Sequence, residues 1–339
     1  MKLSISCSYK LQVQPHVSSP MTVNMPPRYF RRKEKAVFVV GPTGTGKSRL
    51  AIDLATRFPA EIINCDKIQV HKGLDIVTNK VTEEEKQGVS HHLLGSIDPN
   101  AQFTADDFGS HASAVTESLL MRDKLPIIAG GSNSFIEALV NDDPEFWMRY
   151  DCCFLWVDVS LPVLHSLLSE RVDRMVEAGL VDEVRQTFDF NNSDYSQGIR
   201  RAIGVPELDY YFRNEAFMGP KNRAKVLDRA IAKIKENTYL LACRQLQKIH
   251  RLHSRHFWNM HRIDATEVFL RKGMDANEAW DKLVSGPGTL IVDQFLYDRN
   301  HVSSILPVNV VPSLASVAAA TRDRFPLPVP AMTAAAATW

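Results

Sequence analysis

The chain has 339 residues, with 40 lysines and arginines against 39 aspartates and glutamates, which gives a formal net charge of +1. Hydrophobic residues make up 45% and charged residues 23%, as is typical of a soluble globular protein. No apolar run approaches the roughly 18 residues that span a bilayer, which excludes an integral membrane protein. The near-neutral charge argues against a protein that coats nucleic acid. The five cysteines form no C-x-x-C pair and predict ordinary thiols without a zinc site.

The two ends of the chain differ in composition from its middle. Residues 1–35 contain seven basic residues and a single acid, Glu34, and they are rich in serine. They lack the apolar core of a secretory signal, so the composition indicates an organellar transit peptide. The alternative is a disordered leader with no targeting function. Residues 301–339 are mostly Ala, Pro, Val and Ser, and we expect them to form a flexible tail.

The first folded part of the chain alternates between strand and helix patterns. Short apolar runs rich in β-branched residues predict strands at 35–40, 60–65, 125–132 and 152–160. Apolar residues at helical spacing predict a helix over 48–58. Strand, loop, helix and strand at this spacing predict a parallel sheet with crossover helices, and we assign this α/β core to 36–160.

After Pro162 the periodicity becomes helical. Helical patterns cover 163–188, 223–255 and 275–284, and the next strand-like run is GTLIVDQFL at 288–296. We therefore expect a mostly helical insertion or second lobe over 161–285 and a return to the core over 286–300.

Residues 41–48, GPTGTGKS, satisfy the phosphate-loop pattern G-x-x-x-x-G-K-[ST] between a predicted strand and a predicted helix. The glycines let backbone N–H groups converge on phosphate oxygens, and the helix N-terminus adds partial positive charge. We expect Lys47 to reach a terminal phosphate and the Ser48 hydroxyl to ligate Mg²⁺. The fold class is therefore α/β with a P-loop NTPase-like parallel sheet. The predicted phosphate-binding residues are Gly41, Pro42, Thr43, Gly44, Thr45, Gly46, Lys47 and Ser48.

Asp66 directly follows the predicted strand 60–65, so it lies at the carboxyl edge of the sheet, where ligands bind in such folds. A carboxylate there can hold Mg²⁺ through water or act as a general base on an acceptor. The structural alternative is an aspartate that caps the following turn. A phosphate loop by itself serves hydrolysis, kinase chemistry and any transfer with a diphosphate leaving group.

Further motifs follow the phosphate loop in a fixed order. They are NCDKIQVHKGLDIVTNK at 64–80, HHLLG at 91–95, FTADDF at 103–108, AGGSNSFIEAL at 129–139, RVDRMVEAGLVDEV at 171–184, RRAIGVPEL at 200–208 and NTYLLACRQLQKI at 237–249. This series resembles the isopentenyltransferases, a family that includes tRNA dimethylallyltransferases and plant adenylate isopentenyltransferases, over 36–297. The resemblance favours the plant adenylate branch, because Asp66-Lys67 stands where tRNA enzymes typically carry Asp-Ser. The region after 297 also has neither a cysteine nor a histidine pair for a zinc finger, and 36–300 carry more acids than bases.

The resemblance implies the transfer of a dimethylallyl group from dimethylallyl diphosphate to N6 of AMP, ADP or ATP, with release of diphosphate, in cytokinin biosynthesis. Mg²⁺ is the implied cofactor, Asp66 the implied general base, and Thr43 a catalytic residue that orients the amine. Gly198 replaces the first arginine of the family's Gln-Arg-x-x-Arg motif. The substrate-binding residues that the resemblance implies are Lys67, Ser132, Gln197, Arg201, Lys235 and Arg244.

Other interpretations remain open. One is a tRNA dimethylallyltransferase with the same chemistry; others are a small-molecule kinase that uses ATP at the same loop and a nucleotide-binding regulator without catalysis. We expect a monomer with no membrane or tRNA partner, in the plastid, with the mitochondrion or cytosol as alternatives. The segment 221–255 holds ten basic residues and two acids, which fits either a phosphate-binding face or, more commonly, a solvated helix face.

Overall fold

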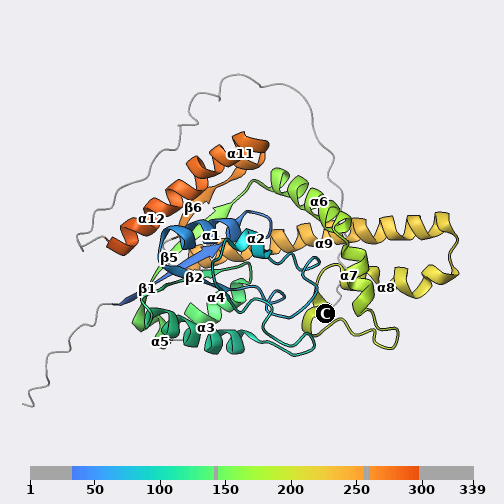
Figure 1. The fold of residues 1–339 in the computed structure, drawn as a ribbon, viewed down its shortest axis with the longest axis horizontal. Coiled ribbons are helices and arrows are strands. Elements are labelled where there is room, and N and C mark those ends of the chain that lie inside the picture. Colours follow the sequence, from blue (N-terminus) through green and yellow to red (C-terminus); the bar gives the residue numbers. More distant parts are fainter. Residues whose placement is uncertain (1–32, 141–143, 256–257, 259, 298–339) are drawn as a thin grey trace, which may run out of the picture. The chain divides into compact units, whose positions relative to one another are not determined.

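The computed structural model describes residues 33–140, 144–255, 258 and 260–297, so most of the predicted leader and the predicted tail lie outside the described residues. In the described part, a six-stranded parallel sheet has the strand order β3-β2-β4-β1-β5-β6 (Figure 1). The strands are β1 (Glu34–Val40), β2 (Ala60–Asn64), β3 (His91–His92), β4 (Leu125–Ala129), β5 (Tyr150–Asp158) and β6 (Met260–Asp264).

The central strands are buried on both faces, which explains their continuous apolar sequences. In β1, Val37 and Val39 pack into one hydrophobic cluster, while Phe38 and Val40 pack into another on the opposite face. Helices cover the sheet on both sides. The helices α1 (Lys47–Arg57) and α12 (Gly286–Tyr297) pack on one face, and α3 (Ala105–Leu120), α4 (Asn133–Val140) and α5 (Pro144–Arg149) on the other (Figure 1).

A second group of helices has its own hydrophobic cluster, built around Val172, Leu180, Leu208 and Ile234. Its elements are α6 (Leu161–Glu177), α7 (Leu180–Thr187), η1 (Gly198–Arg201), α8 (Val205–Asn214), η2 (Glu215–Phe217) and the 36-residue α9 (Pro220–Arg255). The far part of α9 packs against the sheet as well, through Ile249. This long helix therefore connects the helical cluster to the edge where the phosphate loop lies (Figure 1).

The predicted fold class is confirmed, and the predicted strands and helices of the core are present. Two predictions of local structure are wrong. The run 288–296 is part of the helix α12, because a short apolar run that follows a glycine does not distinguish a strand from a buried helix. The strand β6 pairs with β5 inside the range predicted to be helical, and its sequence, MHRID, is too short and polar to stand out. The boundaries of a separate helical lobe remain a prediction.

The short strand β3 was also not predicted, and an ion cluster holds it in place. Glu61 of β2 is buried and accepts hydrogen bonds from His92 Nε2 at 2.7 Å and Arg122 Nη1 at 3.0 Å. These partners hold the pKa of Glu61 below its ordinary value, although burial alone would raise it.

The remaining elements are α2 (Glu83–Lys86), α10 (Thr266–Phe269), α11 (Gly273–Trp280) and the π-helical turn η3 (Asp281–Ser285). None of the described helices is long and apolar enough to cross a membrane.

Candidate active site

The phosphate loop lies between β1 and α1, at the carboxyl edge of the sheet. Gly46, directly before α1, has a φ of 90°, and a Cβ there would lie 2.7 Å from the indole ring of Trp280. Only glycine adopts this conformation at such close approach without strain. The Trp280 Nε1–H in turn donates to Asp53 Oδ2 at 2.6 Å. Trp280 therefore contacts both Gly46, directly before α1, and Asp53, within α1.

Lys47 is buried at the centre of the loop. Its ammonium donates to the carbonyl oxygen of Pro42 at 2.7 Å. Burial lowers the pKa of Lys47 to about 8; the neighbouring Asp66 raises it, and Arg171 lowers it. Ser48 is exposed in the first turn of α1. The loop therefore presents a cation whose charge an incoming phosphate would stabilise, beside an accessible hydroxyl.

Thr43 is held by two helices that are far away in the sequence. Its backbone N–H donates to Gln245 Oε1 of α9 at 2.7 Å, and its hydroxyl accepts from Arg171 Nη1 of α6 at 3.1 Å. Gln245 also donates to the Gly131 carbonyl at 3.0 Å, which connects the phosphate loop to the end of β4. Because Arg171 donates to the threonine oxygen, the hydroxyl proton of Thr43 is available to a substrate.

Asp66 caps the turn that follows β2, as the structural alternative predicted. Its Oδ1 accepts from the backbone N–H groups of Ile68 at 2.9 Å and Gln69 at 3.3 Å. No residue in the described ranges donates a hydrogen bond to the second oxygen, Oδ2. The turn is fixed further by Ser132, whose buried hydroxyl accepts from the Lys67 backbone N–H at 2.9 Å. The capping role and a catalytic role are thus compatible, because one oxygen anchors the carboxylate and the other is free.

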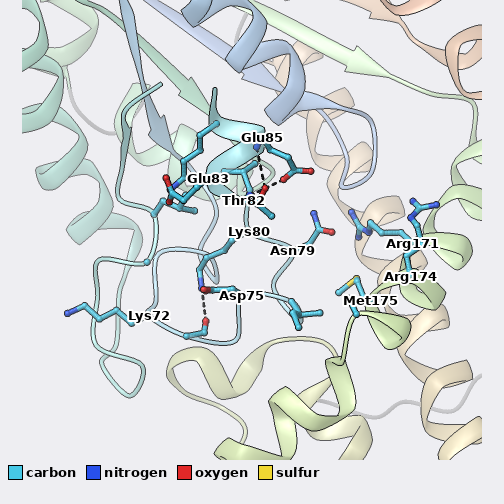
Figure 2. Close-up of a pocket in the computed structure, with 17 residues that line it drawn as sticks. Lys72, Asp75, Asn79, Lys80, Thr82, Glu83, Glu85, Arg171, Arg174 and Met175 are labelled. Carbon is cyan, nitrogen blue, oxygen red and sulfur yellow. Dashed lines mark hydrogen bonds and ion pairs between the residues drawn. The ribbon is translucent and has the colours of Figure 1, made fainter. Parts of the chain in front are cut away.

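A cavity of about 810 Å³ adjoins this site (Figure 2). Arg171, Arg174 and Met175 line it from α6, the loops that carry Lys72 and Lys80 line another side, and α2 contributes Glu83 and Glu85. Burial and the neighbouring Arg174 lower the pKa of Arg171 to about 10, although Asp66 raises it. The Arg171 Nε–H is buried and has no hydrogen-bond partner among the described residues. The cavity wall therefore combines the unpaired Arg171 N–H and apolar side chains with ion-paired lysines and with the carboxylates of Asp75, Glu83 and Glu85.

The predicted substrate-binding residues have different surroundings in the structure. Ser132 and Lys67 lie at the turn of Asp66, and Arg244 is exposed on α9 next to Gln245. Gln197 accepts a hydrogen bond from Gln102 Nε2 at 2.6 Å. The Lys235 ammonium pairs with Asp173 at 2.6 Å, so its charge is already partly compensated.

Gly198 explains the departure from the family motif. Its φ is 54°, and a Cβ there would lie 2.1 Å from the Pro99 carbonyl oxygen, which leaves no room for an arginine. The next residue, Ile199, donates its N–H to the same carbonyl at 2.8 Å. The segment 198–201, which ends at Arg201, is therefore held against the loop at 98–100.

Arg171, Gln245 and Trp280 are the site residues that sequence reasoning missed. Arg171 begins the motif RVDRMVEAGLVDEV and Gln245 follows Arg244 in NTYLLACRQLQKI, so the resemblance offered a signal for both. Trp280 lies outside every motif, and no local pattern marks it.

The described residues contain no group of three or more His, Cys, Asp or Glu side chains that could hold a metal ion by itself. The available oxygen donors are the Ser48 hydroxyl and the Asp66 carboxylate. This set fits Mg²⁺, which is bound through one or two protein oxygens, with substrate phosphates and water as its other ligands.

Comparisons with known proteins show which family the chain belongs to. The family model for IPP transferase matches residues 69–147 and 142–251. The chain is a member of the isopentenyltransferase family. It is 63% identical over 303 residues to adenylate isopentenyltransferase 5 of Arabidopsis thaliana, a chloroplastic protein, covering 87% of this chain and 92% of the relative. It is 54% identical over 312 residues to the mitochondrial adenylate isopentenyltransferase 7 of the same plant, covering 90% and 93%. Identity to the adenylate isopentenyltransferase of Humulus lupulus is 43% over 294 residues, covering 76% and 89%. The resemblance found in the motifs is thus confirmed.

Solved structures share the fold. A eukaryotic dimethylallyltransferase acting on tRNA superposes with a TM-score of 0.68 at 22% identity, covering 79% of this chain and 81% of that one. The tRNA isopentenylpyrophosphate transferase of Bacillus halodurans gives a TM-score of 0.60 at 25% identity, covering 78% and 99%.

Proposed function

We propose that this isopentenyltransferase is an adenylate dimethylallyltransferase. It transfers a dimethylallyl group from dimethylallyl diphosphate to N6 of AMP, ADP or ATP and releases diphosphate, as a step of cytokinin biosynthesis. The observation that carries this proposal is the 63% identity to an adenylate isopentenyltransferase over nearly the whole of both chains. The site supports it, because the Asp66 carboxylate lies close enough to the phosphate loop to raise the pKa of the Lys47 ammonium, and Thr43 belongs to that loop.

Asp66 acts as the general base in this proposal. The exocyclic amine of adenine is a poor nucleophile, because its lone pair is delocalised into the ring. As N6 attacks C1 of the donor, a bond forms between nitrogen and carbon, the bond between C1 and the diphosphate oxygen breaks, and a proton leaves N6. Asp66 Oδ2 accepts that proton, while Oδ1 remains held by the turn. Thr43 orients the amine through the hydroxyl that Arg171 leaves free to donate.

The phosphate loop holds the donor's diphosphate as the leaving group. Negative charge grows on the diphosphate in the transition state, and the loop N–H groups and Lys47 stabilise it in a water-poor environment. Arg171 adds a second buried cation from α6, next to the cavity of Figure 2. When Mg²⁺ is bound, with Ser48 as a ligand, it supplies further charge compensation for the diphosphate.

The proposed location is the plastid, with the mitochondrion as the alternative. Relatives of both locations are similar to this chain, and residues 1–35 have the basic, serine-rich composition of a transit peptide. A reporter fused to residues 1–35 would show plastid fluorescence under this proposal. Cytosolic fluorescence would contradict it.

The reaction is tested by incubating the purified chain with Mg²⁺, radiolabelled dimethylallyl diphosphate and ADP, followed by chromatography of the nucleotides. We expect labelled N6-dimethylallyl-ADP from the native chain and no product from Asp66→Asn, which keeps the size of the side chain but not its basicity. Donor binding should be retained in Asp66→Asn. Full turnover by that variant would contradict the general-base role, and release of the γ-phosphate from ATP without prenylation would favour a kinase.

A further inference from the structure

The last residue of α11, Trp280, packs against the phosphate loop from the C-terminal part of the chain. It is 1% exposed, and it is the largest of the fully buried side chains in the described ranges. A Cβ on Gly46 would lie 2.7 Å from the Cη2 and Cζ3 atoms of its ring and 3.7 Å from the ring of Phe269 in α10. The far edge of the indole therefore fills the space into which a side chain at Gly46 would project.

Two further contacts hold the same ring along α1. The Trp280 Nε1–H donates to Asp53 Oδ2 at 2.6 Å, and the Arg49 guanidinium lies 4.5 Å from the ring centre. Arg49 Nη2 also donates to Asn277 Oδ1 at 3.1 Å, one helical turn before Trp280 in α11. Gly46, Arg49 and Asp53 have the i, i+3, i+7 spacing of a single helix face. Trp280 thus contacts the first two turns of α1 and the glycine that precedes them.

The conformation at Gly46 decides where the following N–H groups of the loop point. Its φ is 90°, and α1 begins at the next residue, Lys47. A phosphate loop binds anions because consecutive backbone N–H groups converge on them, so a rotation at Gly46 would turn the N–H groups of Lys47 and Ser48 away. Glycine restrains its own backbone less than any other residue. The restraint must therefore come from the surroundings, and the Trp280 ring is the nearest group there.

We propose that Trp280 is a positioning residue for the binding of the donor's diphosphate. Its ring holds Gly46 in the conformation that the loop needs, and its hydrogen bond to Asp53 holds the ring. This rests on the proposed function, because it presumes that the phosphate loop binds the diphosphate of the donor. It gives a role in substrate binding to the C-terminal segment, which belongs to none of the motifs that follow the phosphate loop.

The test measures two quantities: the Kd for inorganic diphosphate with Mg²⁺, by calorimetry, and KM for dimethylallyl diphosphate and for ADP. Trp280→Phe is the main variant, because a phenyl ring has neither the indole N–H nor the outer ring atoms that reach Gly46. We expect its Kd for diphosphate and its KM for the donor to rise about tenfold, because the loop is no longer preorganised. KM for ADP at saturating donor should not change.

Asp53 provides a second set of variants that leave the ring in place. Asp53→Ala removes the acceptor of the indole N–H, and we expect a smaller rise of about threefold in the Kd for diphosphate. Asp53→Asn keeps an acceptor oxygen and should restore nearly native affinity. Trp258→Phe is the matched control, because Trp258 is also buried but stacks on Phe154 at 4.6 Å, in the cluster on the other face of the sheet. The control should change neither the Kd nor either KM.

A merely structural role of Trp280 would give a different result. Loss of stability lowers the fraction of active protein, and hence kcat, but leaves the Kd and KM of the folded fraction unchanged. A folded Trp280→Phe variant with the native Kd for diphosphate would therefore overturn the proposal, and so would an equal rise of KM for the donor and for ADP. If circular dichroism shows that Trp280→Phe does not fold, a native Kd in Asp53→Ala overturns it instead. Absence of diphosphate binding by the native chain would contradict the proposed function itself.

Discussion

Raising the pH should weaken donor binding through Lys47. Burial lowers the pKa of this ammonium to about 8 in the free protein. The protonated form, which binds diphosphate, is about nine tenths populated at pH 7 and about one tenth at pH 9. If only this form contributes, the affinity that Lys47 provides is nearly full below pH 7, about half at pH 8, and about tenfold lower at pH 9 than at pH 7.

The assay is isothermal titration of the native chain and of Lys47→Ala with Mg²⁺ and inorganic diphosphate from pH 6.5 to pH 9.5. The ligand's own ionisation affects both proteins equally, so the ratio of their affinities isolates the lysine. That ratio should be constant near pH 6.5 and decline towards 1 above pH 8. A ratio that stays constant through pH 9.5 would show that Lys47 remains protonated, and the argument from its burial would be wrong.

Three substitutions test the surroundings of the site. Gly198→Ala should lower the free energy of unfolding by about 1–3 kcal/mol, because of the positive φ and the clash with the Pro99 carbonyl; an unchanged melting temperature would contradict this. Gln245→Leu leaves the Thr43 N–H unsatisfied, so we expect a stability loss of about 1–3 kcal/mol and a higher KM for the donor, and normal kinetics would refute the proposed connection. Glu61→Gln should lower the melting temperature most at pH 7, because the ionised Glu61 carboxylate stabilises the fold. The gap in melting temperature between the variant and the native chain should narrow as the pH falls below the ordinary pKa of a carboxyl group, since Glu61 then becomes protonated. A gap that grows in acid would contradict this.

The parts of the site that the sequence predicts are those formed by neighbours in the chain. The phosphate loop needs only a strand, eight residues and a helix, and Asp66 follows its strand directly. The turn cap at Asp66 also involves residues two and three positions away. Local patterns of this kind are visible because the chemistry and the geometry occupy one short segment.

The contacts that complete the site are long-range, and no local pattern encodes them. Arg171 reaches Thr43 across 128 positions, Gln245 across 202, and Trp280 reaches Asp53 across 227. The wrong prediction at 288–296 has a related cause, since α12 is defined by packing on α1 and the sheet rather than by a helical apolar stripe. Tertiary packing decided these features, and it becomes visible only in the folded chain.

The most direct test of the proposed acceptor is a competition in one mixture. The purified chain, Mg²⁺ and limiting labelled dimethylallyl diphosphate are incubated with equimolar ADP and unmodified tRNA, and the label is located by mass spectrometry. We expect the label on N6 of ADP and not on tRNA. Label found on an anticodon-loop adenosine, with ADP unmodified, would contradict it and identify a tRNA dimethylallyltransferase instead.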